Sequence, residues 1–323
     1  MTTDPPKWQA PNPKSSAIQW LLDSDPSIRW QVMRDLTDAH DEEVVAERAK
    51  VATEGWGVQL LTSQGVDGYW GTGTSNPEWV TLRTLLLLRE MGLNPTSEGA
   101  RRAVARVRDN VTWKGVLPQD AAWHGKPFFT GEVEPCINGR VLAVGSYFGE
   151  DVQGIVDRLL SEQMSDGGWN CEQESGSTRG SFHTTICVLE GFLEYEQATG
   201  GSPVVKSARE RGQEYLLKRR MLRRLSNGEV IDSAWTLFSF PTGYHYDVLR
   251  GLQYLRKAGI TPDARMAEAI DIVASKQDVD GRWPLENVHP NELDAEPGVA
   301  EAQPSRWNTL RALQVLNWYS ARD

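Results

Sequence analysis

The sequence predicts an all-α fold, arranged as a closed (α/α)6 toroid of six inner and six outer helices. Three observations lead to this prediction. Most of the 323 residues follow a helical period, and no stretch alternates convincingly with the period of a strand. Apolar helices alternate along the chain with polar, amphipathic ones. A short box of residues recurs at about twice a unit of roughly 50 residues, which is typical of a repeat protein.

The repeated box has the form Gln-x-x-Asp-Gly-x-Trp. It occurs at residues 64–70, 163–169 and 277–283. Asp-Gly favours a tight turn, and tryptophan is a large apolar anchor. Each box is therefore expected to be a corner between helices, with a structural rather than a chemical role.

The helices are expected in pairs. Early helices are expected at 17–22, 26–36 and 46–63. The apolar, inner helices are expected at 77–92, 137–148, 182–195, 244–259 and 305–318. The polar, outer helices are expected at 98–110, 151–163, 204–220 and 263–277. The last inner helix is as apolar as the others, whereas an open solenoid would end in a polar cap. We therefore expect a flexible segment at 1–13 and one toroid domain at 14–323.

Composition narrows the class of partner. The formal net charge of −10 argues against a nucleic-acid backbone or an anionic membrane as the main partner. The first residues do not resemble a signal peptide, and no apolar run is long enough to form a transmembrane segment. Three cysteines in a long chain fit a reducing compartment. The expectation is a soluble, cytoplasmic protein.

With these boxes the sequence resembles the prenyltransferase and squalene-oxidase repeat superfamily, which includes terpenoid cyclases and protein prenyltransferase β subunits. The resemblance implies an (α/α)6 toroid. Glu134-Pro135-Cys136 and Phe182-His183-Thr184 are similar to the strings that bind zinc in the prenyltransferase β subunits. The catalytic Asp-x-Asp-Asp string of the cyclases has no counterpart, because Asp278-Val-Asp280-Gly281 lacks the last carboxylate. Residues 128–131 lack the basic side chains that bind a prenyl diphosphate in the family.

A zinc site is expected at one end of the toroid, where the beginnings of inner helices converge. Zinc prefers thiolate and imidazole ligands. The candidate metal ligands are Cys136, Cys171, His183 and His245, with Glu134 able to complete the set. The alternative is that the cysteines are small buried apolar residues and the histidines are hydrogen-bonded residues of the core.

Further candidates lie at the same end of the inner helices. Tyr246 and Asp247, together with Glu134, are the candidate catalytic acids and bases. Candidate substrate-binding residues are Trp79, Tyr244, Arg140 and Trp307, whose aromatic members suit an isoprenoid or another apolar ligand. Ordinary ring packing and solvated polar groups are the alternatives. His124, in a loop, is a further candidate.

The function expected is that of a zinc-dependent enzyme of the terpenoid-cyclase and prenyltransferase-like type, acting on an isoprenoid-like or other hydrophobic small molecule in a central cavity. The alternative is a non-catalytic toroid that binds a hydrophobic ligand or a protein partner without metal. A third possibility is a cyclase that uses another acid, which would require a buried carboxylate with a raised pKa.

Overall fold

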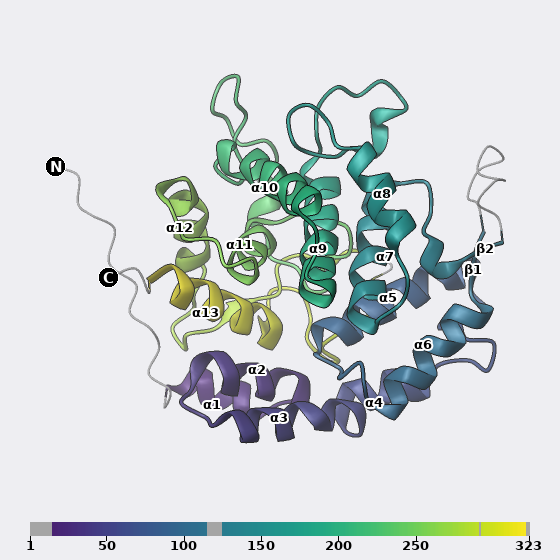
Figure 1. The fold of residues 1–323 in the computed structure, drawn as a ribbon. Helices are drawn as coiled ribbons and strands as arrows, with labels where there is room; N and C mark the ends of the chain where they lie inside the picture. Colours follow the sequence, from purple (N-terminus) through teal and green to yellow (C-terminus); the bar gives the residue numbers. More distant parts are fainter. Residues whose placement is uncertain (1–14, 115–124, 291, 321–323) are drawn as a thin grey trace. The chain divides into compact units, whose positions relative to one another are not determined.

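The all-α prediction is confirmed. The computed structural model describes residues 15–114, 125–290 and 292–320, and Figure 1 shows their helices, α1 to α13. Two short antiparallel pairs, β1 (Thr112–Trp113) with β2 (Lys126–Pro127) and β3 (Trp283–Pro284) with β4 (Pro304–Ser305), are the strands of the described chain. Strands of two residues leave no alternating pattern, so the sequence did not predict them.

The described chain divides into two compact units. Unit 1 consists of residues up to Glu47, Leu216–Thr242 and Tyr246–Asp323; unit 2 consists of Arg48–Tyr215 and Gly243–His245. The prediction of a single toroid over 14–323 depends on how the two units are joined. It therefore stays a prediction. The expected flexible segment at 1–13 lies outside the described residues.

In unit 2 the expected alternation of buried and amphipathic helices is observed. The helices of this unit are α4 (Gly55–Thr62), α5 (Pro77–Glu90), α6 (Glu98–Asn110), α7 (Pro135–Phe148), α8 (Gln153–Ser161), α9 (Phe182–Thr199) and most of α10 (Pro203–Lys218). Helix α7 is buried from Pro135 to Ser146, whereas α6 and α8 bury one face each. Figure 1 shows α7 and α9 side by side, with α8 next to α7.

Helices α7 and α9 approach closely because glycine faces glycine. A Cβ atom at Gly139 would lie 2.5 Å from the carbonyl oxygen of Cys187, and one at Gly191 would lie 2.4 Å from that of Gly139. Both neighbours are backbone atoms, so a larger residue could be accommodated only by separating the helices. This contact fixes the start of α7 relative to α9, and both helix starts carry candidate ligands.

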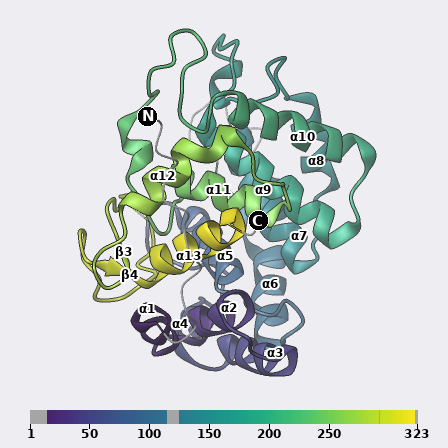
Figure 2. The same ribbon diagram turned by 90° about the vertical axis from the view of Figure 1, so that its left-hand side faces the viewer.

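Unit 1 contains the first helices and the last. Its helices are α1 (Ser16–Leu22), α2 (Pro26–Leu36), most of α3 (Asp41–Ala49), α11 (Val248–Lys257), α12 (Ala267–Ser275) and α13 (Arg306–Ser320). Helix α13 packs on both α2 and α11, through hydrogen bonds from Gln314 to Asp35 (2.6 Å) and from Gln253 to Gln314 (2.9 Å). Figure 2 shows the β3–β4 pair beside the start of α13.

The three boxes are structural corners, as expected. In each box the indole Nε1 donates to a carbonyl oxygen of the preceding helix at 2.7 Å: Leu60 for Trp70, Leu159 for Trp169 and Val273 for Trp283. In each, the tryptophan backbone N donates to a threonine hydroxyl of the following helix, at 3.1, 3.0 and 2.9 Å respectively. The glycine of each box has a φ of +80° to +90°, a conformation that favours glycine.

Several predicted helix boundaries were wrong. The helix expected at 263–277 begins as the short helix η6 (Ala264–Met266), and α12 starts only at Ala267. The helix expected at 46–63 is interrupted by η1 (Lys50–Ala52), and α4 starts only at Gly55, whose φ is +62°. The helix expected at 244–259 starts at Val248, because the Asp247 carboxylate caps it by accepting from Arg250 N at 2.7 Å. Tyr244, His245 and Tyr246 therefore belong to the loop before α11. None of the described helices combines the length and apolar character that crossing a membrane requires.

Candidate metal centre

The turn before α7 is held by a reciprocal contact between Glu132 and Asn138. Asn138 accepts from Glu132 N and donates to Glu132 O, both at 2.7 Å, while the Glu132 carboxylate accepts from Glu134 N at 3.1 Å. Gly131 has a φ of +80°, and a Cβ atom there would lie 2.3 Å from Asn138 Oδ1. The turn thus fixes the backbone of Glu134 and of Cys136, the second residue of α7.

The loop that carries Cys171 is closed on the start of α9. Ser181 N donates to Trp169 O at 2.7 Å, and the Asn170 side chain caps the short helix η4 (Cys171–Gln173). The Cys171 sulfur lies 3.4 Å from Thr184 Oγ1, the hydroxyl to which Cys171 N also donates. The position of Cys171 is therefore fixed by contacts on both sides: the repeat box precedes it in the chain, and α9 follows it.

These two segments bring together one carboxylate and two thiols. The ligand atoms of Glu134, Cys136 and Cys171 all lie within 4.8 Å of one another, and together they could hold a metal ion. Cys136 Sγ lies 3.4 Å from Glu134 Oε2. Glu134 is exposed, Cys171 is half-buried and Cys136 is buried, so the group reaches from the surface into unit 2.

The two thiols are inequivalent. Their mutual hydrogen bond and burial raise the pKa of Cys136 well above its ordinary value. The hydrogen bond from Cys136, aided by that from Thr184, lowers the pKa of Cys171, although burial opposes this shift. Cys171 is therefore the more readily ionised sulfur of the pair, as expected of a thiol stabilised by hydrogen-bond donors.

The donors fit a zinc ion chemically and by distance. Zinc takes thiolates at about 2.3 Å and carboxylate oxygens at about 2.0–2.2 Å, so tetrahedral ligands lie roughly 3.5–3.8 Å apart. Donors within 4.8 Å of one another would need to move inward by roughly 1 Å or less. Two thiols next to a carboxylate also agree with the preference of zinc for sulfur.

His183 and His245 form a neighbouring cluster of rings with Tyr244. The His183 ring lies 5.7 Å from His245 and 6.1 Å from Tyr244 between centroids, edge to face in both cases, and Tyr244 stacks on His245 at 4.0 Å. Cys187 Sγ lies 3.7 Å from Tyr244 O, which holds this loop against α9. The histidines predicted as ligands thus lie in an aromatic cluster, and the converged donor group is that of Glu134, Cys136 and Cys171.

Other candidates of unit 2 lie at helix starts. Trp79, half-buried on α5, packs edge to face on Trp113 with centroids 6.0 Å apart. Arg140 is buried on α7, one turn after Cys136. His124 lies outside the described residues.

The remaining candidates belong to unit 1 and are buried there. The Tyr246 hydroxyl donates to Met221 O at 2.7 Å, and Trp307 stacks on Phe240 with centroids 4.4 Å apart. Burial raises the pKa of Asp247, whose carboxylate caps α11. Asp247 also accepts from Ser239 Oγ at 3.3 Å, and that hydroxyl lies 3.1 Å from His289 Nε2. Neither Ser239 nor His289 belongs to a motif, so the sequence did not indicate this chain of contacts.

The comparisons with known proteins concern the fold. No family model and no curated protein matches the sequence. Among solved structures, a protein from Actinoplanes is similar at 17% identity and a TM-score of 0.48, with 95% of this chain and 98% of that chain covered. The type II terpene cyclase MstE from Scytonema, in complex with merosterolic acid A, is similar at 18% identity and a TM-score of 0.45, with 92% and 86% covered.

A glycosyl hydrolase of family 88 from Bacteroides vulgatus is similar at 11% identity and a TM-score of 0.48, with 94% and 95% covered. A type II terpene cyclase is thus among the structures to which this chain is similar.

Proposed function

We propose that Glu134, Cys136 and Cys171 bind a zinc ion, and that the protein is a zinc-dependent enzyme acting on an isoprenoid-like or other hydrophobic small molecule. The observation that carries this proposal is the convergence of one carboxylate and two thiols, from two separate segments, within 4.8 Å. Three protein ligands are typical of catalytic zinc sites, in which the fourth position is left for water or substrate.

The residues around the donors would prepare them for the metal. Cys136 lies at the N-terminus of α7, where the helix dipole favours the negative charge that a ligating thiol acquires. Thr184, by its contact with the Cys171 sulfur, would hold that ligand in place, and the Glu132–Asn138 contact would hold Glu134. A bound zinc ion would supply Lewis-acid polarisation, or would lower the pKa of a thiol or water.

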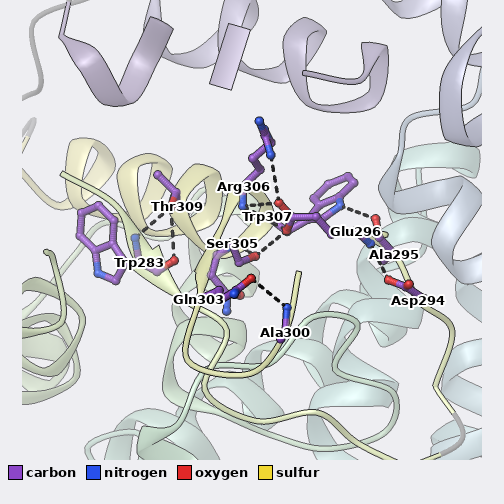
Figure 3. Close-up of polar contacts among 11 residues, drawn as sticks. Trp283, Asp294, Ala295, Glu296, Ala300, Gln303, Ser305, Arg306, Trp307 and Thr309 are labelled. Carbon is purple, nitrogen blue, oxygen red and sulfur yellow. Dashed lines mark hydrogen bonds and ion pairs between the residues drawn. The ribbon is translucent and has the colours of Figure 1, made fainter. Parts of the chain in front are cut away.

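The substrate class is supported by the ring cluster next to the donors. Tyr244 is exposed and is stacked on His245, while His183 lies at the start of α9, one residue before the threonine that contacts Cys171. Such a surface suits an apolar ligand with a polar end. Within unit 2 we propose substrate contacts for Tyr244, Trp79 and Arg140. His183 or His245 as a fourth ligand would close the shell of the metal and make the site structural rather than catalytic. The roles expected of Trp307 (Figure 3), Tyr246 and Asp247, which belong to unit 1, stay predictions.

Cobalt substitution tests the metal site together with turnover. The protein stripped with a chelator and loaded with Co²⁺ should show the thiolate-to-cobalt charge-transfer absorption that sulfur ligands produce, and Cys171→Ala should lose much of it. Zinc-loaded and stripped protein would then be incubated with farnesol, and the mixture followed by mass spectrometry. Metal-dependent consumption that Cys136→Ala lacks supports the enzyme. Absence of the charge-transfer band from wild type would overturn the metal site.

A further inference from the structure

Two of the three cysteines of the chain form a hydrogen-bonded pair. The sulfur atoms of Cys136 and Cys171 share a hydrogen bond and lie within 4.8 Å of each other, and all three cysteines are free thiols. A disulfide needs about 2.05 Å between its sulfurs, so the two atoms are separated by a further roughly 3 Å or less. The pair is thus close enough for a bond once the side chains turn toward each other.

The main chain at both cysteines is held, whereas their sulfurs are held weakly. Cys136 lies in the first turn of α7, and its sulfur contacts Glu134 Oε2 at 3.4 Å. The Cys171 sulfur contacts Thr184 Oγ1, also at 3.4 Å. Sulfur is a weak hydrogen-bonding atom, and one rotatable bond moves it between staggered positions. Cys171 also begins a helix of three residues, none of them buried, so any remaining adjustment falls on this short segment.

The three thiols differ in their access to solvent. Cys171 is half-buried and is followed by the exposed residues 172–176, whereas Cys136 and Cys187 are buried. The Cys187 sulfur is directed to another contact, with Tyr244 O at 3.7 Å. An oxidant that arrives from solvent therefore meets Cys171 first, and Cys136 is the thiol that lies behind it.

We propose that Cys171 and Cys136 form a site of reversible oxidative modification, in which a peroxide oxidises Cys171 and Cys136 then closes a disulfide with it. In the first step the Cys171 sulfur attacks one oxygen of hydrogen peroxide and the O–O bond breaks. The thiol becomes a sulfenic acid, and the other oxygen leaves as water with the thiol proton.

In the second step the Cys136 sulfur attacks the sulfur of Cys171. The S–O bond of the sulfenic acid breaks, and the hydroxyl leaves as a second water with the proton of the Cys136 thiol. Two thiols thus lose two electrons in total, and one peroxide is reduced to two waters. Exchange with a small thiol would return both cysteines to the reduced form.

The disulfide would remove two of the three donors of the metal centre, a consequence that rests on the zinc site proposed above. Zinc binds the thiolate form of cysteine, so the oxidised centre would keep only the Glu134 carboxylate. A bound zinc ion would conversely occupy both sulfurs. Metal and peroxide would therefore compete for the same two atoms, and oxidation would release the metal.

Peptide mapping without reductant tests the modification on the full wild-type chain. Chelator-stripped protein treated with a small excess of hydrogen peroxide should yield the peptides of Cys136 and Cys171 joined, lighter by two hydrogen atoms than the separate peptides. Cys187 should stay reduced, and dithiothreitol should separate the joined peptides. Cys187→Ala is the matched control and should form the same link. Cys136→Ala should stop at the sulfenic acid of Cys171, which dimedone traps.

Two results with wild type would overturn the modification site: oxidation of Cys171 without a link to Cys136, or a link to Cys187 in its place. Zinc-loaded protein, treated in parallel, should form the link several-fold more slowly, and the linked protein should bind no Co²⁺ through sulfur. A link that forms in stripped protein and is indifferent to zinc would contradict the metal centre and leave the modification site standing. Zinc binding without a link in stripped protein would contradict the modification site alone.

Discussion

The sulfur atoms of Cys136 and Cys171 lie within 4.8 Å of each other, although one begins an α-helix and the other lies in a loop beyond the next helix. Their hydrogen bond lowers the pKa of Cys171 and raises that of Cys136. Cys136 also contacts the Glu134 carboxylate, and Cys171 also contacts the Thr184 hydroxyl. Several consequences of this arrangement and of the packing around it can be measured.

The reactivity of Cys171 should depend on Cys136. In chelator-stripped protein, removal of the donor by Cys136→Ala should shift the pH midpoint of Cys171 alkylation upward, because the thiolate loses its main stabilising hydrogen bond. Iodoacetamide labelling at several pH values, read by peptide mass spectrometry, gives the midpoint. Cys187→Ala is the control and should leave it in place. An unchanged midpoint in Cys136→Ala would contradict the proposed contact.

The close approach of α7 and α9 should be sensitive to a single methyl group. Gly139→Ala would place a Cβ atom 2.5 Å from a backbone carbonyl oxygen, so it should destabilise the protein by about 1–3 kcal/mol. Gly154→Ala, on α8, meets nothing within 4 Å and should be neutral or stabilise by up to about 1 kcal/mol. Urea unfolding of both variants compares them. Equal stability would refute the tight helix contact.

The box corners should depend on the threonine hydroxyls. Thr185→Val keeps the shape of the side chain but leaves the buried Trp169 N without its 3.0 Å acceptor, which should cost about 1–3 kcal/mol. Thr185→Ser retains the hydroxyl and should cost less, even though it removes a methyl group. The free energies of unfolding of both variants give the comparison. A valine variant as stable as the serine variant would show that this hydrogen bond does not hold the corner.

Asp247 should make stability depend on pH in an unusual direction for a carboxylate. Its pKa is raised in the folded protein by burial, so its stabilising contribution is complete below the unfolded pKa of about 3.9 and is lost as pH rises through the folded pKa. Asp247→Asn removes this titration and keeps a good helix cap. Wild type should therefore gain stability relative to Asp247→Asn as pH is lowered from neutral. A difference that is constant, or that moves the other way, contradicts the raised pKa.

Local signals in the sequence predicted much of this arrangement. Each Asp-Gly-x-Trp box is self-contained, because a glycine with positive φ and a buried indole define a corner whatever surrounds it. The alternation of apolar and amphipathic helices was predictable for the same reason, because the pattern of apolar residues within each helix indicates how much of that helix is buried. Cys136 and Cys171 were recognisable because helix starts and box loops place them at the same end of neighbouring helices.

Contacts between residues that belong to no motif could not be predicted from the sequence. Glu132 and Asn138 determine the turn that aims Glu134, yet each is an ordinary polar residue in the chain. The chain from Asp247 through Ser239 to His289 joins three segments by tertiary packing alone. The start of α11 was missed because Asp247 acts as a cap, and the residues before it follow the same apolar pattern as the helix.

The most direct test of the proposed metal centre is elemental analysis of the purified protein, wild type beside Cys136→Ala, Cys171→Ala and Cys187→Ala. We expect about one zinc per chain in wild type and in Cys187→Ala, and loss of most of the metal in the other two variants. His183→Ala, measured alongside, shows whether the imidazole supplies the fourth ligand. Wild-type protein that holds no zinc even after zinc has been offered would contradict the proposed metal centre, and the chain would then be better described as a ligand-binding protein without metal.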